Sequence, residues 1–213
     1  TAFFWSNVAA SNQAYPPKLY GDSNDAITTL RMQQGDGQHN PSFWGPEFGF
    51  ARAMAEHTDK KVLIIKACRG GGGNGYWDKT IAAENHDAGH MWLHLSDTID
   101  TALNILSKRG DTFSVQGLVY LQGESNSAEE SGVAGQRLAS LYANLQDHVN
   151  LKYSNTADSM KLVLVEIAAS QKTQARKQTT QQHQELVERE LSVAFVQTRD
   201  LPLQPDEIHF GKQ

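Results

Sequence analysis

The chain has 213 residues, of which 39% are hydrophobic and 20% are charged, and its formal net charge is −5 at pH 7. These values are typical of an ordinary globular protein and exclude a disordered or fibrous chain. The mild acidity, and apolar runs shorter than about 18 residues, indicate that neither nucleic acid nor a membrane is a partner. A single cysteine, Cys68, excludes an internal disulfide.

Apolar patterns predict strands and helices that alternate along one domain, residues 1–213. The predicted elements are a strand at residues 1–5, a long loop, a helix from Pro46, a strand at 62–65, a helix at 95–106, a strand from Val115, a helix at 138–149, a strand at 162–167, a helix at 171–191 and a strand at 193–196. Such alternation implies right-handed crossovers and a mainly parallel sheet with helices on both faces, which is the α/β class.

Polar residues follow the strand that begins at Val115. Gln122, Gly123 and Glu124 come directly after its apolar run. Open α/β sheets bind their ligands beyond the carboxyl ends of their strands, so these are candidate site residues. The alternative is a tight glycine turn with solvated side chains.

Four glycines, residues 70–73, follow the strand at 62–65 and the segment that ends at Arg69. Glycine lets backbone N–H groups approach a ligand closely, so this run is a candidate anion cradle or oxyanion hole. No Lys-Ser or Lys-Thr follows it, which excludes a Walker loop. The alternative is a flexible surface loop.

His86, His90 and His94 recur at every fourth residue, which on one helix would align three imidazoles for zinc. Gly89 interrupts this helix, and no acidic residue is placed as in a His-Glu-x-x-His site. We therefore expect no metal and no other cofactor.

Asp206 and His209 follow the last predicted strand and are three residues apart. At this spacing Asp206 can hold the imidazole tautomer while His209 acts as a general base. An ordinary surface pair is the alternative. Taken together, the three strand ends offer backbone donors at Gly70 and Gly71, an amide donor at Gln122, and a general base with its orienting acid.

Four motifs in series resemble the SGNH (GDSL-like) hydrolases, specifically the sialate O-acetylesterase and acetyl xylan esterase group. They are Gly45-Pro46-Glu47, the strand ending Lys66-Ala67-Cys68-Arg69-Gly70-Gly71, Gln122-Gly123-Glu124-Ser125, and Asp206-Glu207-Ile208-His209-Phe210. The resemblance implies a flavodoxin-like three-layer sandwich and a serine esterase that removes O-acetyl groups from a sugar or polysaccharide. It also implies Asp206 and His209 as catalytic residues and Gly70 and Gln122 as hydrogen-bond donors to the oxyanion. We expect Glu124 to position these residues without contacting the substrate.

The chain departs from this group at the nucleophile, because no Gly-Gln-Ser-Asn block occurs in it. Ser6, and after it Ser23, lie in the segments most similar to this block. We nevertheless expect the nucleophilic serine upstream of Thr1. We also expect both ends of the domain to be trimmed. The missing block also leaves open a non-catalytic glycan-binding or assembly module on the same scaffold.

The expected partner is an acetylated carbohydrate, and a polysaccharide substrate favours a secreted or periplasmic location. Trp44, Tyr76 and Trp77 could stack on a sugar, or they pack within the fold. The patterns make no prediction about oligomeric state.

Overall fold

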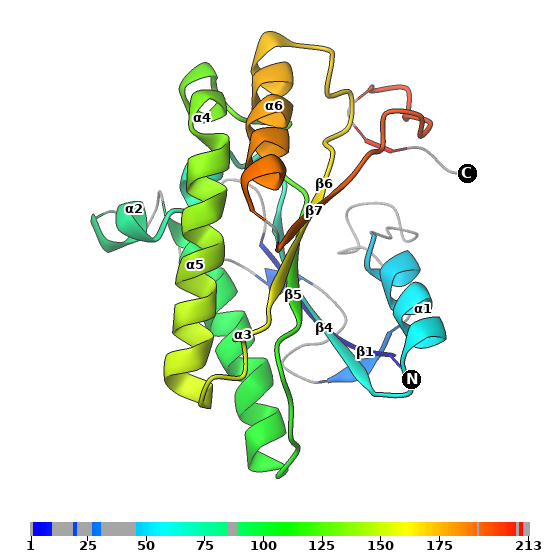
Figure 1. The fold of residues 1–213 in the computed structure, drawn as a ribbon, viewed down its shortest axis with the longest axis vertical. Coiled ribbons are helices and arrows are strands. Elements are labelled where there is room, and N and C mark those ends of the chain that lie inside the picture. The colour runs from blue at the N-terminus through cyan, green and yellow to red at the C-terminus, as the bar shows by residue number, and fades with distance from the viewer. Residues whose placement is uncertain are drawn as a thin grey trace. The chain divides into compact units, whose positions relative to one another are not determined.

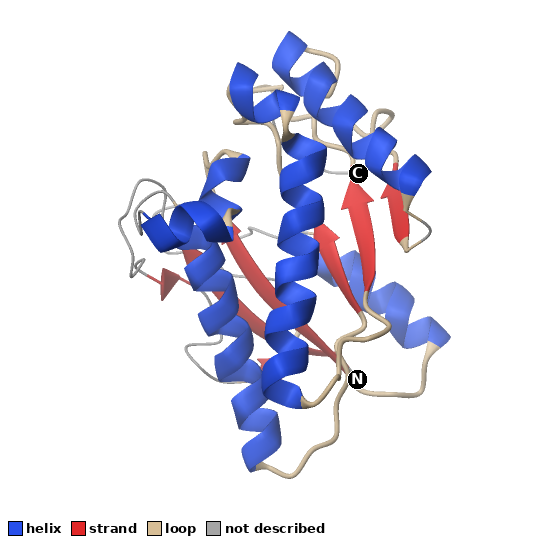
Figure 2. Cartoon of the chain, turned by 60° about the vertical axis from the view of Figure 1, so that its left-hand side comes forward, coloured by secondary structure: helices blue, strands red, loops and turns tan. Residues whose placement is uncertain are grey.

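The computed structural model describes residues 2–9, 19–20, 27–30, 46–84, 89–190, 192–207 and 209–210. Contacts divide the chain into two compact units, one of residues 1–70 and 90–112 and the other of residues 71–89 and 113–213. Helices and strands alternate along the chain (Figures 1 and 2), so the predicted α/β class is confirmed. Among the described helices, none has the length and apolar character that crossing a membrane requires.

The first unit is built on a parallel strand pair. Its elements are β1 (Ala2–Ala9), β2 (Leu19–Tyr20), β3 (Thr28–Thr29), α1 (Glu47–His57), β4 (Val62–Arg69) and α3 (His90–Lys108). β1 pairs in parallel with β4 over its whole length, and β2 and β3 pair with β1 antiparallel. These two short strands lie where a loop was predicted, because two residues are too few to show a strand period.

Helix α1 begins after Pro46 as predicted. Its two aromatic side chains, however, are not buried as the sequence pattern suggests. Phe48 and Phe50 are 45% and 39% exposed, whereas Glu47 and Ala51 are buried. The Glu47 carboxylate accepts a hydrogen bond from Lys66 Nζ of β4 at 2.9 Å. An ion pair that is mostly removed from water therefore connects this helix start to the sheet.

Helix α3 supplies much of the core of the first unit and packs against β1 and β4. One of its faces is buried through Met91, Trp92, Leu95, Ile99, Ala102 and Leu103. The helix ends at Lys108, and Gly110 follows with φ +73°, a conformation that favours glycine.

The second unit contains a fully parallel sheet in the order β5-β6-β7. Its elements are a 3₁₀ turn (Asn74–Trp77), α2 (Lys79–Glu84), β5 (Gly117–Tyr120), α4 (Ala128–Gly132), α5 (Ala134–Tyr153), β6 (Lys161–Val165), α6 (Gln174–Arg189) and β7 (Val193–Val196). Helices α5 and α6 lie side by side (Figure 1).

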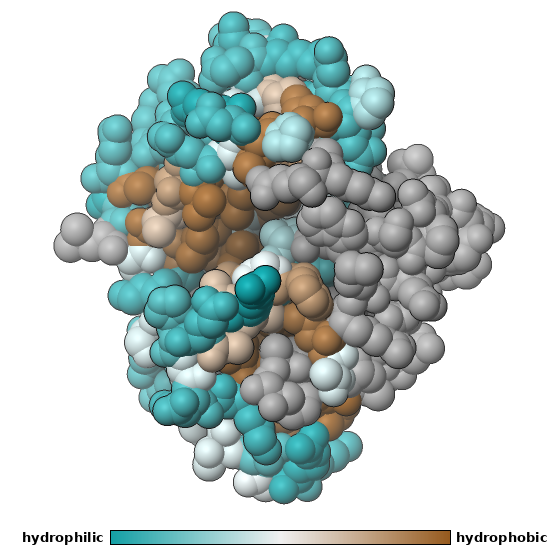
Figure 3. Space-filling model, turned by 90° about the vertical axis from the view of Figure 1, so that its right-hand side faces the viewer, coloured by the Kyte–Doolittle hydropathy of each residue, from teal (hydrophilic) through white to brown (hydrophobic). Residues whose placement is uncertain are grey.

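The side chains of this sheet differ in how deeply they are buried. Leu162 and Leu164 of β6 are fully buried, whereas Val119 of β5 and Val196 of β7 are 40% and 45% exposed. Figure 3 shows one face of the molecule on which apolar surface lies among hydrophilic residues.

Because β5, β6 and β7 are parallel, their carboxyl ends lie at the same edge of the sheet. The segments that leave this edge begin at Leu121, Glu166 and Gln197. Two of these segments carry Gln122 and Glu124, and the Asp206–His209 pair, so they hold most of the predicted site residues.

Candidate functional site

Asp206 and His209 lie in a compact turn after β7. An antiparallel bridge joins Leu203 to Phe210, and Gln204 N donates to the His209 carbonyl oxygen at 2.8 Å. The two oxygens of Asp206 contact the same residue: Oδ1 accepts from His209 N at 3.0 Å, and Oδ2 lies 2.6 Å from His209 Nδ1. One carboxylate therefore holds both the backbone and the ring of this histidine.

This arrangement determines the histidine tautomer. A carboxylate oxygen and an unprotonated ring nitrogen are both acceptors, so at 2.6 Å the hydrogen must be on Nδ1. In the neutral ring Nε2 is then the acceptor, which is the form that a general base needs. The histidine and aspartate side chains are 64% and 43% exposed, so a reacting group has access to the ring.

Gln122 lies at the end of β5 and is buried in a polar network. Its Oε1 accepts from the Tyr120 hydroxyl at 2.9 Å, and its Nε2 donates to Gly72 O at 3.1 Å and to Asn126 Oδ1 at 2.7 Å. Both amide hydrogens thus have protein acceptors. An oxyanion at this amide would take the place of one of them.

Part of the glycine run is closely packed against a glutamate. A Cβ at Gly73 would lie 2.3 Å from Glu130 Oε1 and from Oε2. The Glu130 carboxylate accepts from Gly75 N at 3.0 Å and from Ser127 N at 2.9 Å, and the Ser127 side chain completes a capping box at the start of α4. Gly73, the last glycine of the run, therefore packs against this carboxylate. Ser127-x-x-Glu130 is a capping signature that was not recognised in the sequence.

Asn126 joins this network and was also missed. Its Oδ1 accepts from Asn74 N at 3.0 Å, and its Nδ2 donates to Thr179 Oγ1 of α6 at 3.1 Å. It follows the Gln-Gly-Glu block by two residues, and its buried side chain makes polar contacts with both the 3₁₀ turn and α6.

The neighbouring aromatic and imidazole groups are neutral. Burial, followed by the negative charges of Glu124 and Glu130, raises the pKa of the Tyr120 phenol, which therefore stays a hydrogen-bond donor. Burial lowers the pKa of His183 in α6 to about 4. Its ring lies edge-on to Tyr120 with centroids 6.0 Å apart.

Glu124 connects two loops of the sheet edge. Its Oε1 accepts from Ala168 N at 3.3 Å, and its carbonyl oxygen accepts from Arg176 Nε at 3.4 Å. These contacts hold the β5 loop against the segment after β6, through Ala168, and against the first turn of α6, through Arg176.

A second carboxylate, Glu166, fixes the loop that leads to the histidine. It is 1% exposed and accepts from Ser170 Oγ at 2.9 Å, Thr198 N at 3.0 Å and Arg199 at 3.4 Å. Sequence analysis missed Glu166, because an acidic residue at the end of an apolar strand resembles a solvated strand end.

Gly70 and Gly71 follow β4 and are exposed. Gly71 has φ +70°, which favours glycine, and a Cβ there would meet no atom within 4 Å. Gly70 lies in the first unit and Gln122 in the second. Their partnership as oxyanion donors stays a prediction.

Two of the three histidines of the zinc hypothesis, His90 and His94, lie on α3. His90 is buried on α3 and its ring contacts the Arg69 guanidinium. His94 is buried on the same helix, and His86 lies outside the described residues. Over the part of the chain that the structure describes, no group of three or more potential ligands forms a metal site.

The remaining candidates are the aromatic residues that could stack on a sugar and the two serines within the chain. Some of them lie in described elements, and the others lie outside the described residues. Trp77 packs edge-on against Tyr120 at 6.3 Å, and Tyr76 is half-buried beside it in the 3₁₀ turn. Ser6 lies in β1 opposite Lys66. Ser23 and Trp44 lie outside the described residues.

Comparisons with known proteins agree with the motif analysis. A family model described as carbohydrate esterase, sialic acid-specific acetylesterase matches residues 25–213. A crystal structure of a protein from Arabidopsis thaliana is similar at TM-score 0.61 and 16% identity, over 95% of this chain and 73% of the other. NanS is similar at TM-score 0.61 and 16% identity, over 97% of this chain and 72% of its own. No curated protein sequence matches the chain.

Proposed function

The chain belongs to the carbohydrate esterase family of sialic acid-specific acetylesterases, and we propose that it is a serine esterase that removes O-acetyl groups from a sugar through an acyl-enzyme. The observation that carries this proposal is the double contact of Asp206 with His209. It leaves Nε2 of an accessible imidazole as the proton acceptor, as serine activation requires.

In this mechanism His209 Nε2 takes the proton of the serine hydroxyl as its oxygen attacks the acetyl carbonyl. The imidazolium then protonates the departing sugar oxygen, and Asp206 stabilises the positive ring. A water molecule, deprotonated by the same histidine, releases acetate from the serine. We expect the serine upstream of Thr1, with Ser6 and then Ser23 as alternatives within the chain.

The oxyanion would be stabilised by Gly70 N–H, or Gly71 N–H, and by the Gln122 amide. Gln122 Nε2 donates to Gly72 O at 3.1 Å in the structure, so the oxyanion would replace this carbonyl as acceptor. The loss of one such donor typically costs about 2.7–4 kcal/mol of transition-state stabilisation. Glu124 would support the site through Ala168 N without contacting the substrate.

A glycan-binding or assembly module remains the second candidate, and the missing Gly-Gln-Ser-Asn block favours it. Such a module would keep the scaffold and bind a sugar without hydrolysing an ester.

Hydrolysis of an O-acetylated sialic acid separates the two candidates. We would compare the parent, His209→Ala and His57→Ala, each in a chain extended upstream of Thr1. His57 is the matched control, because it is an exposed histidine at the end of α1 whose ring contacts the Ala53 carbonyl. The esterase proposal expects acetate release by the parent and by His57→Ala, and a loss on the order of 10³-fold or more in His209→Ala. Sugar binding without acetate release would favour the module.

A further inference from the structure

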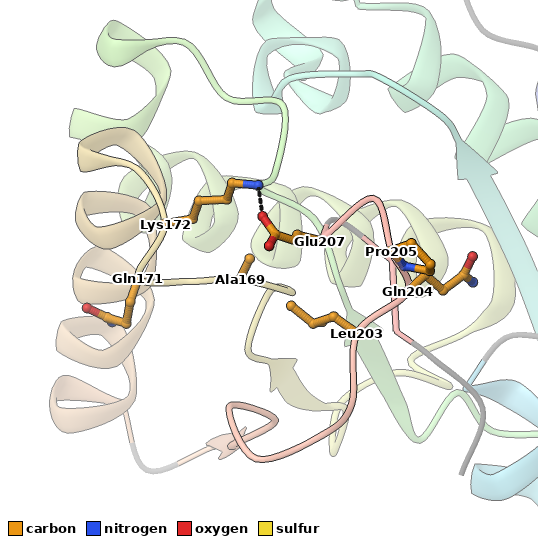
Figure 4. Close-up of a pocket in the computed structure, with 7 residues that line it drawn as sticks. All are labelled: Ala169, Gln171, Lys172, Leu203, Gln204, Pro205 and Glu207. Atoms are coloured by element: carbon orange, nitrogen blue, oxygen red, sulfur yellow. Dashed lines mark hydrogen bonds and ion pairs between the residues drawn. The ribbon is translucent and has the colours of Figure 1, made fainter.

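An open groove of about 710 Å³ lies beside the turn that carries Asp206 and His209. One side comes from the segment after β6 and the other from the segment after β7 (Figure 4). The lining residues are Ala169, Gln171 and Lys172 on the first side, and Leu203, Gln204, Pro205 and Glu207 on the second. Because Gln204 N donates to the His209 carbonyl at 2.8 Å, the second side and the histidine belong to the same turn.

An ion pair crosses this groove. Lys172 Nζ donates to Glu207 Oε2 at 2.6 Å, and Figure 4 shows the two side chains directed toward each other. The hydrogen bond and charge of Lys172 lower the pKa of the Glu207 carboxyl, so this carboxylate is charged at neutral pH. Its side chains are 44% and 66% exposed, and exposed pairs of this kind are readily exchanged for other partners.

The backbone on both sides of the groove is held in an uncommon conformation. Ala169 has φ +48° and Glu207 has φ +54°, in the left-handed region that residues other than glycine seldom adopt. Each lies in a closed turn: Lys172 N donates to Ala169 O, and Glu207 N donates to Gln204 O, both at 2.9 Å. Such conformations concentrate at ligand-binding sites, where the surrounding structure maintains them.

We propose that this groove binds the sugar of an acidic substrate, that Lys172 binds the sugar carboxylate, and that Glu207 is the resident counter-ion which that carboxylate displaces. This inference rests on the proposed function, since it assigns the specificity of the same site. Within the described residues, the Lys172 ammonium contacts only the Glu207 carboxylate, and an ammonium has three donors to offer.

The rest of the lining fits a sugar. The exposed amide of Gln171 can bond hydroxyl groups, and the apolar side chains of Ala169, Leu203 and Pro205 offer contacts to the C–H groups of a ring. A carboxylated sugar in this groove would place its acetyl ester beside the turn that holds His209.

Substituting each of the two charged residues in turn, and measuring sugar binding, distinguishes ligand recognition from structural support. If the Lys172–Glu207 pair only stabilised the turn, removal of either charge would weaken sugar binding in the same way. If Lys172 binds the ligand, Lys172→Gln weakens binding of an acidic sugar, whereas Glu207→Gln removes a competitor and strengthens it.

The experiment measures binding of N-acetylneuraminic acid and of its methyl ester by calorimetry, with the parent, Lys172→Gln, Glu207→Gln and Lys177→Gln. The methyl ester carries a methyl group on the carboxyl and so lacks its negative charge. Lys177 is the matched control, an exposed lysine of α6 that does not line the groove. We expect the parent and Lys177→Gln to prefer the acid by about tenfold, as a charge-assisted hydrogen bond provides. The preference should vanish in Lys172→Gln and rise in Glu207→Gln.

Three results would overturn this inference: equal binding of acid and ester by the parent, an unchanged preference in Lys172→Gln, or a reduced preference in Glu207→Gln. Hydrolysis of a neutral acetyl ester by the parent separates this failure from failure of the proposed function. His209-dependent hydrolysis without an acid preference removes only the groove assignment. Absence of both hydrolysis and binding contradicts both.

Discussion

Asp206 holds His209 through two hydrogen bonds, from the backbone nitrogen to Oδ1 at 3.0 Å and from the ring Nδ1 to Oδ2 at 2.6 Å. The pair is local, because the two residues are three apart in one turn. The Glu166 contacts with Thr198 and Arg199 then fix the chain that leads into this turn. The orientation of the imidazole is thus built into a short segment at the carboxyl edge of the sheet.

Asp206→Asn should reduce kcat on an acetyl ester by on the order of 10³–10⁴-fold, because an amide can donate to Nδ1 and so favours the wrong tautomer. Steady-state kinetics would measure the loss. Asp200→Asn is the matched control, since Asp200 is an exposed aspartate between β7 and the same turn, and it should keep the parent rate. A rate for Asp206→Asn within a factor of about two of the parent would show that Asp206 does not control the tautomer.

Gln122→Ala should lower kcat by about 10²–10³-fold with little change in KM, the pattern of an interaction made only in the transition state. The same substitution also removes bonds to Tyr120, Gly72 and Asn126, so stability must be measured alongside.

Asn126→Ala is the control for Gln122, because it disrupts the same network but keeps the Gln122 amide. Urea denaturation should show a loss of about 1–3 kcal/mol for either variant, since each leaves buried polar groups without partners. Equal effects of the two substitutions on kcat would assign Gln122 to structure and not to the oxyanion.

Gly73→Ala should destabilise the protein by about 1–3 kcal/mol, because the new Cβ would lie 2.3 Å from the Glu130 carboxylate oxygens and displace them from Gly75 N. Gly49→Ala is the comparison, since nothing lies within 4 Å of its added Cβ in α1. It should stabilise the protein by about 0.5–1 kcal/mol. Equal melting temperatures for Gly73→Ala and the parent would contradict the close packing of Glu130.

His183 should make stability depend on pH between 6.5 and about 4. Burial lowers its pKa from 6.5 to about 4, so the unfolded chain binds a proton in this range that the folded chain does not. The contribution of His183 is therefore fully present above pH 6.5 and is lost as pH falls toward 4, with a magnitude of about 3 kcal/mol. Urea unfolding of the parent and His183→Gln at several pH values would measure it. The parent should lose more stability than the variant on acidification, and parallel curves would be evidence against a neutral buried His183.

The elements could be predicted because their patterns are local. The strand at 193–196 has the predicted bounds, and α5 and α6 contain the apolar residues that indicated them. The polar strand ends were also visible, since Gln122 and Asp206 each follow an apolar run. Strands β2 and β3 were not, because each has only two residues and is defined by its pairing with β1.

The contacts that build the site could not be predicted in the same way. Lys172 and Glu207 are 35 residues apart and Asn74 and Asn126 are 52 apart, so no period connects them. A helical or strand pattern indicates which face of an element is buried, but it does not say which polar side chains meet across loops. Glu130 is the exception, because the capping signature from Ser127 could have located it at the start of α4.

In the proposed mechanism His209, oriented by Asp206, activates a nucleophilic serine. Labelling with a fluorophosphonate reports this activation, because the reagent reacts with a serine hydroxyl only where a base activates it. The rate of labelling and the modified peptide would be determined by mass spectrometry for the parent, His209→Ala and His57→Ala, in a chain extended upstream of Thr1. We expect one rapidly labelled serine in the parent and in His57→Ala, and labelling slowed by on the order of 10³-fold in His209→Ala. Equally fast labelling of that serine in His209→Ala, or acetate release by a parent that the reagent does not modify, would contradict it.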